Sequence, residues 1–187
     1  MYINPISQRD PAWRAQYLGH SRETIGNYGC AITCLAMLLN ASLQLTDEQP
    51  VYDPLVINAT LKANVGFINH NFVRWPALGT IWPYLKYTGR IDCPTRPASP
   101  AQLGEIDRRL AADWPVIIYV DAKAHEPGLQ QHFVLVTGTQ DGDYAICDPW
   151  DGVQTTLCGR YGNTPAIAVC GVIMLDFDAE WTPKRPN

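Results

Sequence analysis

This chain of 187 residues has 14 lysines and arginines and 18 aspartates and glutamates, which give a formal net charge of −4 and a pI near 5.5. Its 47% of hydrophobic and 17% of charged residues are typical of a globular domain with a substantial core and exclude a disordered chain. The lack of a basic run argues against a nucleic-acid partner, and no segment reaches the roughly 18 consecutive apolar residues of a membrane span. We expect one domain over 1–187, with its core in about 6–178 and a loose tail in 179–187.

The first half of the chain is expected to be mainly helical. Prolines and glycines punctuate 1–29, which predicts irregular structure. The stretch 30–40 is apolar nearly all round and predicts a buried helix, and a second helix is expected within 53–64. The aromatic-rich segment 75–88 is ambiguous and predicts a short helix at most, while 91–100 predicts a proline-rich loop.

Strands dominate the second half. Ser99 followed by Pro100 is a typical helix start and predicts one more helix over 99–110. Runs of β-branched, aromatic and leucine residues predict strands at 116–120, 133–137, 144–147 and near 171–177. A glycine- and threonine-rich loop is expected before the last strand. Helices that come first and strands that cluster late predict the α+β class.

The six cysteines, at positions 30, 34, 93, 147, 158 and 170, are expected to be free thiols, because a chain of this length needs no disulfide scaffold. If any pair forms a bridge, we expect Cys158 and Cys170. The first ten residues lack a basic segment followed by an apolar one, so they do not resemble a signal peptide. We therefore favour a cytoplasmic protein, unless a signal was removed or export is by lysis.

Two of the predicted strands flank a turn-rich segment that contains Asp141-Gly142, which predicts an antiparallel hairpin. If this hairpin is centred near Gln140, opposed residues have numbers that sum to 280. His132 then lies directly opposite Asp148 on the same face, with Cβ atoms about 4.5–5.5 Å apart. A slip of one residue would put the two side chains on opposite faces, so the pairing depends on this register.

Cys30 follows Gly29 at the predicted start of the apolar helix. The partial positive charge of a helix N-terminus and a nearby protonated histidine both lower the pKa of a thiol. A carboxylate such as Asp148 on one nitrogen of His132 would fix the tautomer and leave the other nitrogen free to take the thiol proton. Gly29 would leave room for the backbone of a substrate. These residue types together predict a cysteine nucleophile enzyme.

A set of short strings, in a fixed order along the chain, resembles a known family. In the first half they are Gln8-Arg9-Asp10-Pro11-Ala12-Trp13, Leu18-Gly19, Thr24-Ile25, Gly29-Cys30 and Thr33-Cys34-Leu35-Ala36-Met37. In the second half they are Trp114-Pro115-Val116-Ile117, His132 with Val134, Val136 and Gly138, then Tyr144, Ile146, Asp148-Pro149-Trp150 and Gly152. Their ordered combination, over roughly 6–152, resembles the C39-like cysteine peptidases, which are papain-like proteins.

The resemblance implies a papain-like fold, in which the cysteine lies on a central helix that packs against a C-terminal antiparallel sheet. It implies Cys30 as the nucleophile, His132 as general base and acid, and Asp148 as the group that orients the histidine. It also implies that the Gln8 amide and the Cys30 backbone N–H form the oxyanion hole. No cofactor and no metal are implied.

The activity implied by the resemblance is cleavage of a peptide or isopeptide bond through an acyl-enzyme. The substrate would be a small peptide or a peptidoglycan stem peptide, in a bacterial or phage setting. Trp13, Gly29 and Trp150 are expected in the substrate cleft, because they flank the catalytic candidates. The oligomeric state is left open.

Each candidate also has a simpler explanation. Cys30 can be a core residue of a buried helix, and His132 can be a hydrogen-bonded strand histidine. Asp148 before a proline can be a turn former, and Gln8 can be an ordinary loop residue. A tryptophan is also simply a good core residue.

Three further alternatives belong to other classes. A zinc site built from Cys30, Cys34, Cys93 and His125 would need paired ligands at finger-like spacing, which the sequence lacks. An acyltransferase of the transglutaminase type could use the same triad, and an added amine acceptor would reveal it. A non-catalytic peptide-binding or structural module of the same fold would be expected to have lost one of the three triad residues.

Overall fold

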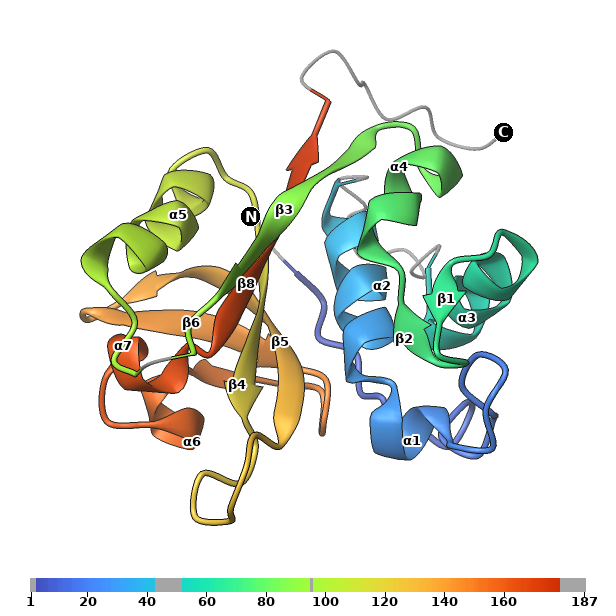
Figure 1. Ribbon diagram of the computed structural model, residues 1–187, viewed down its shortest axis with the longest axis horizontal. Helices are drawn as coiled ribbons and strands as arrows, with labels where there is room; N and C mark the ends of the chain where they lie inside the picture. The colour runs from blue at the N-terminus through green and yellow to red at the C-terminus, as the bar shows by residue number, and fades with distance from the viewer. Residues whose placement is uncertain (1–2, 43–51, 95, 179–187) are drawn as a thin grey trace.

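The computed structural model describes residues 3–42, 52–94 and 96–178. Within these residues, helices and a small hairpin fill most of the first half of the chain, and the second half supplies most of a large antiparallel sheet (Figure 1). The predicted α+β class is therefore confirmed, as is the packing of a cysteine-bearing helix on the sheet. The predicted tail, 179–187, lies outside the described residues.

The described helices are α1 (Ile25–Tyr28), α2 (Cys30–Ser42), α3 (Pro54–Ala63), α4 (Leu78–Ile81), α5 (Pro100–Leu110), α6 (Cys158–Tyr161) and α7 (Pro165–Ala168), with a 3₁₀ turn η1 (Trp75–Ala77). The large sheet has the order β3-β8-β4-β5-β6-β7, formed by β3 (Leu85–Asp92), β8 (Gly171–Phe177), β4 (Val116–Asp121), β5 (Gln131–Gln140), β6 (Asp143–Asp148) and β7 (Val153–Thr156). All its paired strands are antiparallel. Two short strands, β1 (Phe67–Ile68) and β2 (Phe72–Val73), form the separate hairpin.

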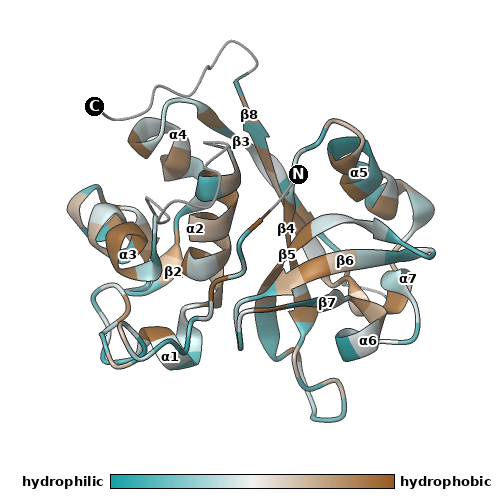
Figure 2. Ribbon diagram, turned by 180° about the vertical axis from the view of Figure 1, so that it is seen from behind, coloured by the Kyte–Doolittle hydropathy of each residue, from teal (hydrophilic) through white to brown (hydrophobic). Residues whose placement is uncertain are grey.

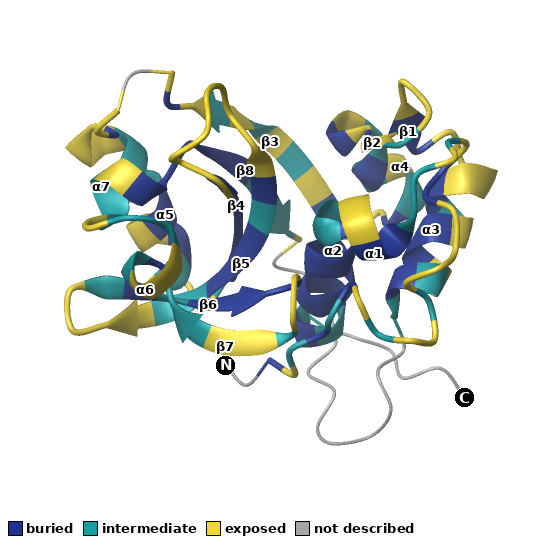
Figure 3. Cartoon of the chain, turned by 90° about the horizontal axis from the view of Figure 1, so that it is seen from below, coloured by how far each residue is buried: buried dark blue, intermediate teal, exposed yellow. Residues whose placement is uncertain are grey.

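The core lies on both faces of the large sheet. Ile117 and Leu135 face the cluster that contains α2, whereas Ile118 and Val134 face a second cluster that contains Ile106 of α5. This alternation follows the two-residue period of a strand. All of β4 is buried because both of its faces are covered, and it is dark blue in Figure 3, whereas the edge strand β7 has exposed residues.

Helix α2 is the central helix of the first cluster, and residues 32–39 are all buried. Its mainly apolar surface, drawn mostly in brown and pale shades in Figure 2, lets it pack against the sheet on one side and α3 on the other. The predicted burial of this helix is confirmed. Its first residue, Cys30, is only partly buried, so the helix starts at the surface and continues into the core.

Two other predicted helices are also confirmed, each with the expected capping chemistry. Asp53 caps α3 by accepting a 2.8 Å hydrogen bond from the Val56 N–H. Ser99 and Gln102 form a reciprocal capping box at the start of α5, with Pro100 at its first position.

Several segments differ from the sequence predictions. The first 29 residues contain α1. The segment 75–88 contains the predicted short helix, as η1 and α4, but its end belongs to the edge strand β3, which also occupies the start of the predicted proline-rich loop. The loop expected before the last strand contains β7, α6 and α7. The helices α1, α6 and α7 have four residues each, too few for a helical periodicity to be recognised in a sequence. The strand β3 has eight residues that alternate in burial, so its length does not explain this difference.

None of the helices in the described part of the chain is both long enough and apolar enough to cross a lipid bilayer.

Candidate active site

The β5–β6 hairpin has a different register from the predicted one. Its turn is Asp141-Gly142, with φ of 51° and 81°, as a two-residue type I′ turn requires. This turn pairs Gln140 with Asp143, so the residue numbers of paired positions next to the turn sum to 283. A bulge at Thr137 then adds one residue to β5, and farther from the turn the sum is 282. The predicted sum of 280 is therefore wrong.

The bulge nevertheless keeps His132 and Asp148 on one face of the sheet. A sum of 283 along the whole hairpin would have placed them on opposite faces, because a shift by an odd number reverses every side chain. The observed sum of 282 differs from the predicted one by two, so Asp148 lies diagonally from His132 instead of directly opposite. His132 Nε2 and Asp148 Oδ1 are 2.8 Å apart, which confirms the predicted contact.

Asp148 is fully buried at the end of β6, and both of its oxygens accept hydrogen bonds. Oδ1 accepts from His132 Nε2 and, at 2.9 Å, from the Trp150 backbone N–H. Oδ2 accepts from Arg160 Nη1 at 2.6 Å and from the Tyr161 hydroxyl. Burial would raise the pKa of this carboxyl group, but the hydrogen bond and charge of His132, with the other donors, hold it far below its ordinary value. Asp148 is therefore an anion throughout the neutral range.

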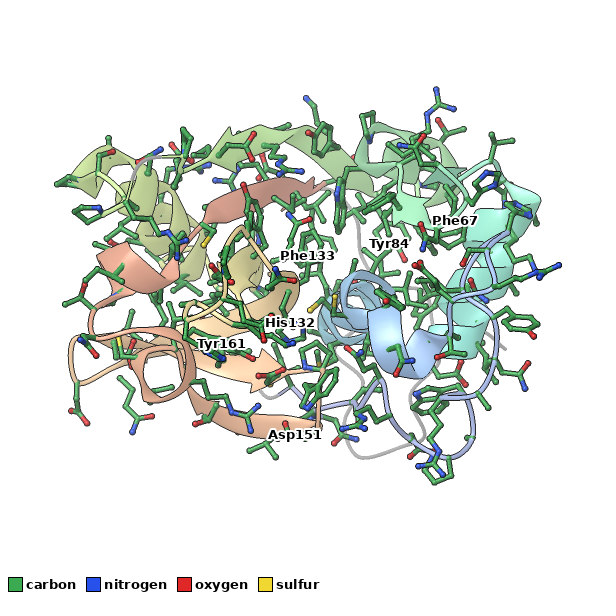
Figure 4. The ribbon with its side chains drawn as sticks, turned by 60° about the horizontal axis from the view of Figure 1, so that its bottom comes forward. Phe67, Tyr84, His132, Phe133, Asp151 and Tyr161 are labelled. Carbon is green, nitrogen blue, oxygen red and sulfur yellow. The ribbon has the colours of Figure 1, made fainter. Side chains whose placement is uncertain are left out.

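His132, which belongs to β5, lies next to the aromatic rings of Trp150 and Tyr161. The Trp150 ring meets it edge-on at a centroid distance of 6.5 Å, and the Tyr161 ring is tilted against it at 5.9 Å. Figure 4 shows His132 and Tyr161 side by side. Burial would lower the pKa of the imidazole, but hydrogen bonds to Asp148 and Cys30 and the charges of both raise it to about 9. Because Nε2 bonds Asp148, the nitrogen that faces Cys30 is Nδ1.

The Cys30 thiol is the partner of His132 and lies at the first residue of α2. Burial alone would raise the pKa of this thiol. A hydrogen bond from His132, the positive charge of that ring, and the backbone N–H groups of Phe133 and Ala31 together lower it below its ordinary value. The pKa of Cys30 and that of His132 are therefore shifted in the directions that favour a thiolate–imidazolium pair.

The other five cysteines have the opposite shift. All six are free thiols, so the Cys158–Cys170 pair is not bridged. The pKa of each of the five is raised, chiefly by burial, and that of Cys158 and Cys147 reaches about 12. Cys158 and Cys30 both belong to partly buried residues, but only Cys30 has a lowered pKa.

Gln8 links the segment around Asp148 to the segment before Cys30. It is 1% exposed, its backbone N–H donates to the Pro149 carbonyl at 2.6 Å, and its side-chain Nε2 donates to the Gly26 carbonyl at 3.0 Å. The side-chain amide keeps a second N–H, and its Oε1 accepts no hydrogen bond among the described residues. A glutamine in an ordinary surface loop would be solvated, whereas Gln8 is buried and held by hydrogen bonds from both its backbone and its side chain.

Gly152 closes the turn after Asp148 against Ser7, the neighbour of Gln8. Its φ is 71°, and a Cβ there would lie 2.9 Å from the Ser7 backbone nitrogen. Gly142 has a similar φ of 81° but open space around its Cα. The two glycines therefore share a positive φ that would strain any residue with a Cβ, but they differ in what that Cβ would contact.

We expect Gly152→Ala to lower stability by about 1–2 kcal/mol through backbone strain, and also to displace the Ser7–Gln8 segment. The matched control, Gly142→Ala, should lose similar stability without moving Gln8. Denaturant unfolding of both variants, together with the catalytic rate, separates the two effects. Equal rates in the two variants would mean that the contact with Ser7 does not position Gln8.

Of the three residues predicted to line a substrate cleft, Trp150 is exposed beside His132, whereas Trp13 and Gly29 pack within the chain. Trp150 is 42% exposed beside His132, and the Arg9 guanidinium lies 4.5 Å from its ring centroid. Trp13 donates from Nε1 to the Ser7 carbonyl at 2.8 Å and packs against the core, so it supports the Gln8 segment. A Cβ at Gly29 would lie 2.5 Å from the Ile25 carbonyl oxygen, so packing within the chain already requires this glycine.

Arg160 and Tyr161 are functional candidates that the sequence analysis missed. They come from α6, a helix of four residues inside the segment predicted as a loop. Nothing in the local pattern marks them, because both are distinguished by a contact with Asp148, 12 and 13 residues earlier in the chain. Within the described residues no group of three or more histidine, cysteine, aspartate and glutamate side chains is arranged to hold a metal ion.

Comparison with known proteins adds only distant structural similarities. No protein-family model matches the sequence, and no curated protein matches it. The peptidase domain of Streptococcus ComA, a bifunctional ABC transporter involved in a quorum sensing pathway, is 15% identical over 81% of this chain and 93% of that domain, with a TM-score of 0.47. A Bacillus anthracis protein described as a C39-like peptidase is 13% identical over 93% of this chain and 98% of its own, with a TM-score of 0.48. Similarities of this size leave the chemistry of this chain to be argued from its own side chains.

Proposed function

We propose that this protein is a cysteine hydrolase that cleaves a peptide or isopeptide bond, with Cys30 as the nucleophile. One observation carries the proposal: among six free cysteines, only Cys30 has a lowered pKa, and its partner His132 has a raised one. Opposite shifts in a contacting thiol and imidazole are what a preformed ion pair requires. Asp148 completes the triad by holding Nε2 of that imidazole.

The proposed reaction follows from these positions. The Cys30 thiolate attacks the carbonyl carbon, and the His132 imidazolium gives its Nδ1 proton to the leaving amine as the C–N bond breaks. The remaining thioester is attacked by water, which loses a proton to the now neutral His132. The carboxylic acid product leaves, and the thiolate–imidazolium pair is restored. Asp148 stays ionised and holds the ring in place in both halves of the reaction.

The tetrahedral intermediate needs hydrogen-bond donors for its oxyanion. The Cys30 backbone N–H at the start of α2 and the free N–H of the Gln8 amide are the candidates, since Gln8 is anchored to Gly26 just before that helix. Loss of one such donor commonly lowers the rate about 10²–10³-fold. The substrate class, a small peptide or a peptidoglycan stem peptide, rests on the resemblance seen in the sequence.

The pH dependence of turnover should be bell-shaped. Acylation needs the Cys30 thiolate, which is lost as the pH falls through its lowered pKa, and the His132 imidazolium, which is lost as the pH rises through about 9. Alkylation of Cys30 needs only the thiolate, so it should persist above pH 9 while turnover falls. Measuring both profiles on one preparation checks this divergence, and a turnover that keeps rising above pH 9 would contradict the assigned role of His132.

The test of the function itself is a substrate screen with trapping of the acyl-enzyme. Wild-type protein and Cys30→Ala are incubated with peptide mixtures and with peptidoglycan stem peptides, and products and adducts are identified by mass spectrometry. We expect cleavage and a thioester on the peptide that contains Cys30 in the wild type, and neither in the variant. An added primary amine should not be incorporated; dominant amine adducts would instead identify an acyltransferase, and inertness towards every substrate would favour a binding module.

A further inference from the structure

Helix α6 is rigidly attached to the hairpin that carries Asp148. Leu157, fully buried just before the helix, donates its backbone N–H to the Tyr144 carbonyl at 2.8 Å. The Cys158 backbone N–H donates to Asp143 Oδ2 at 2.9 Å. The helix α6 and the strand β6, which carries Asp148, are therefore joined by hydrogen bonds into one unit. Side chains of α6 can hold Asp148 without closing a flexible loop.

Arg160 and Tyr161, which we name the α6 clamp, use one oxygen of Asp148 and leave the other to the histidine. Both donate to Oδ2, whereas Oδ1 accepts from His132 and the Trp150 N–H. A carboxylate held through one oxygen can still rotate about its Cβ–Cγ bond, but one held through both cannot. The α6 clamp thus fixes the direction in which Oδ1 faces the imidazole.

Arg160 is itself held by a second carboxylate. Its Nη1 lies 3.1 Å from Asp151 Oδ1, and its Nη2 donates to Asp151 Oδ2, so the guanidinium bridges Asp148 and Asp151. The planar fork suits this double contact, which a lysine cannot reproduce. Tyr161 adds a second restraint, because its ring also packs against His132.

We propose that Arg160 and Tyr161 are positioning residues of this site: by holding Oδ2 of Asp148, they keep its Oδ1 aligned with Nε2 of His132. Neither residue is assigned a contact with substrate. The catalytic consequence rests on the proposed function, whereas the alignment of Asp148 with His132 is a property of the folded chain alone. Without the α6 clamp, the His132 imidazolium is oriented less firmly. It therefore stabilises the Cys30 thiolate less.

Two readouts on the full chain test this inference. The first is the rate of Cys30 alkylation by iodoacetamide against pH. The second is the NMR signal of the His132 Nε2 proton, which the hydrogen bond to Asp148 shifts downfield and protects from exchange with water. The variants are Arg160→Gln, Tyr161→Phe and Arg160→Lys. Arg90→Gln is the matched control, because it removes an arginine–aspartate pair of similar length, 2.6 Å to Asp92, on the distant strand β3.

We expect Arg160→Gln and Tyr161→Phe to move the acid limb of alkylation upward by about one pH unit, which means about tenfold slower labelling within that limb. The Nε2 proton signal should broaden or disappear in both. Arg160→Lys should recover only part of the wild-type behaviour, and Arg90→Gln should retain all of it. A structural role alone would lower thermal stability without moving either readout.

Wild-type profiles and proton signals in Arg160→Gln and Tyr161→Phe would overturn the inference. Failure of the proposed function gives a different result: Cys30 of the wild type would then label like an ordinary thiol at every pH. In that case the Nε2 proton signal still decides the α6 clamp, because it reports the contact between His132 and Asp148 independently of the thiol.

Discussion

Iodoacetamide is expected to label Cys30 alone among the six cysteines, and to go on doing so well below pH 8. The reason is that the thiolate is the reactive species, and only at Cys30 do the surroundings lower the pKa of the thiol. An ordinary thiol, with a pKa of about 8.5, is only about 1% thiolate at pH 6.5. A thiolate paired with the His132 imidazolium should therefore react far faster than an ordinary thiol at that pH.

His132→Ala should slow this labelling about 100-fold at pH 6.5, because the thiol then loses both its hydrogen bond and the nearby positive charge. Peptide mass mapping locates the label, and Cys30→Ala shows the background. Cys158 is an internal control, since it is also a partly buried free cysteine but has a raised pKa. Equal labelling of Cys30 and Cys158, or labelling of Cys30 only after denaturation, would remove the basis of the catalytic proposal.

Asp148→Asn should have the second large effect, a loss of turnover on the order of 10⁴-fold. The neutral amide no longer stabilises the imidazolium, and its NH₂ group can face the Nε2 proton of His132, which would favour the wrong tautomer. Arg160 and Tyr161 lose the anion that their hydrogen bonds reach. Removal of one partner from a buried ion pair commonly costs about 3–5 kcal/mol of stability.

Asp148→Asn should also change how the free energy of unfolding depends on pH in the acid range. The pKa of Asp148 is depressed in the folded protein, so its ionisation stabilises the fold above its unfolded pKa of about 3.9. This contribution is lost as the pH falls below that value towards the folded pKa, and Asp148→Asn should lack it at every pH. Urea unfolding at several pH values measures the difference.

Asp151→Asn is the matched control for that experiment. Asp151 is partly exposed and contacts Arg160 but not His132, so this variant removes only a surface pair worth less than about 1 kcal/mol. Turnover should fall far less than in Asp148→Asn. If the two variants lose turnover and stability equally, the damage lies in the Arg160 bridge and not in the orientation of the histidine.

Much of the architecture could be predicted because it depends on local chemistry. The nearly uniform apolar surface of α2 requires burial wherever the helix lies, and Ser99 with Pro100 starts a helix regardless of its neighbours. The Asp141-Gly142 pair fits a two-residue hairpin turn. The predicted contact of His132 with Asp148 is confirmed, although the register from which it was predicted is wrong.

The way in which His132 and Asp148 come into contact depends on the tertiary structure. The turn by itself sets a register that would separate His132 from Asp148, and only the bulge at Thr137 brings their side chains back to one face. With this bulge in place, Leu135 packs in the cluster of α2, and Val134 and Val136 pack in the cluster of α5. The donors to Asp148 Oδ2 come from a four-residue helix that has no signal of its own. Residue types and regular elements were therefore readable from the sequence, whereas register and the surroundings of a buried charge depend on contacts between distant segments.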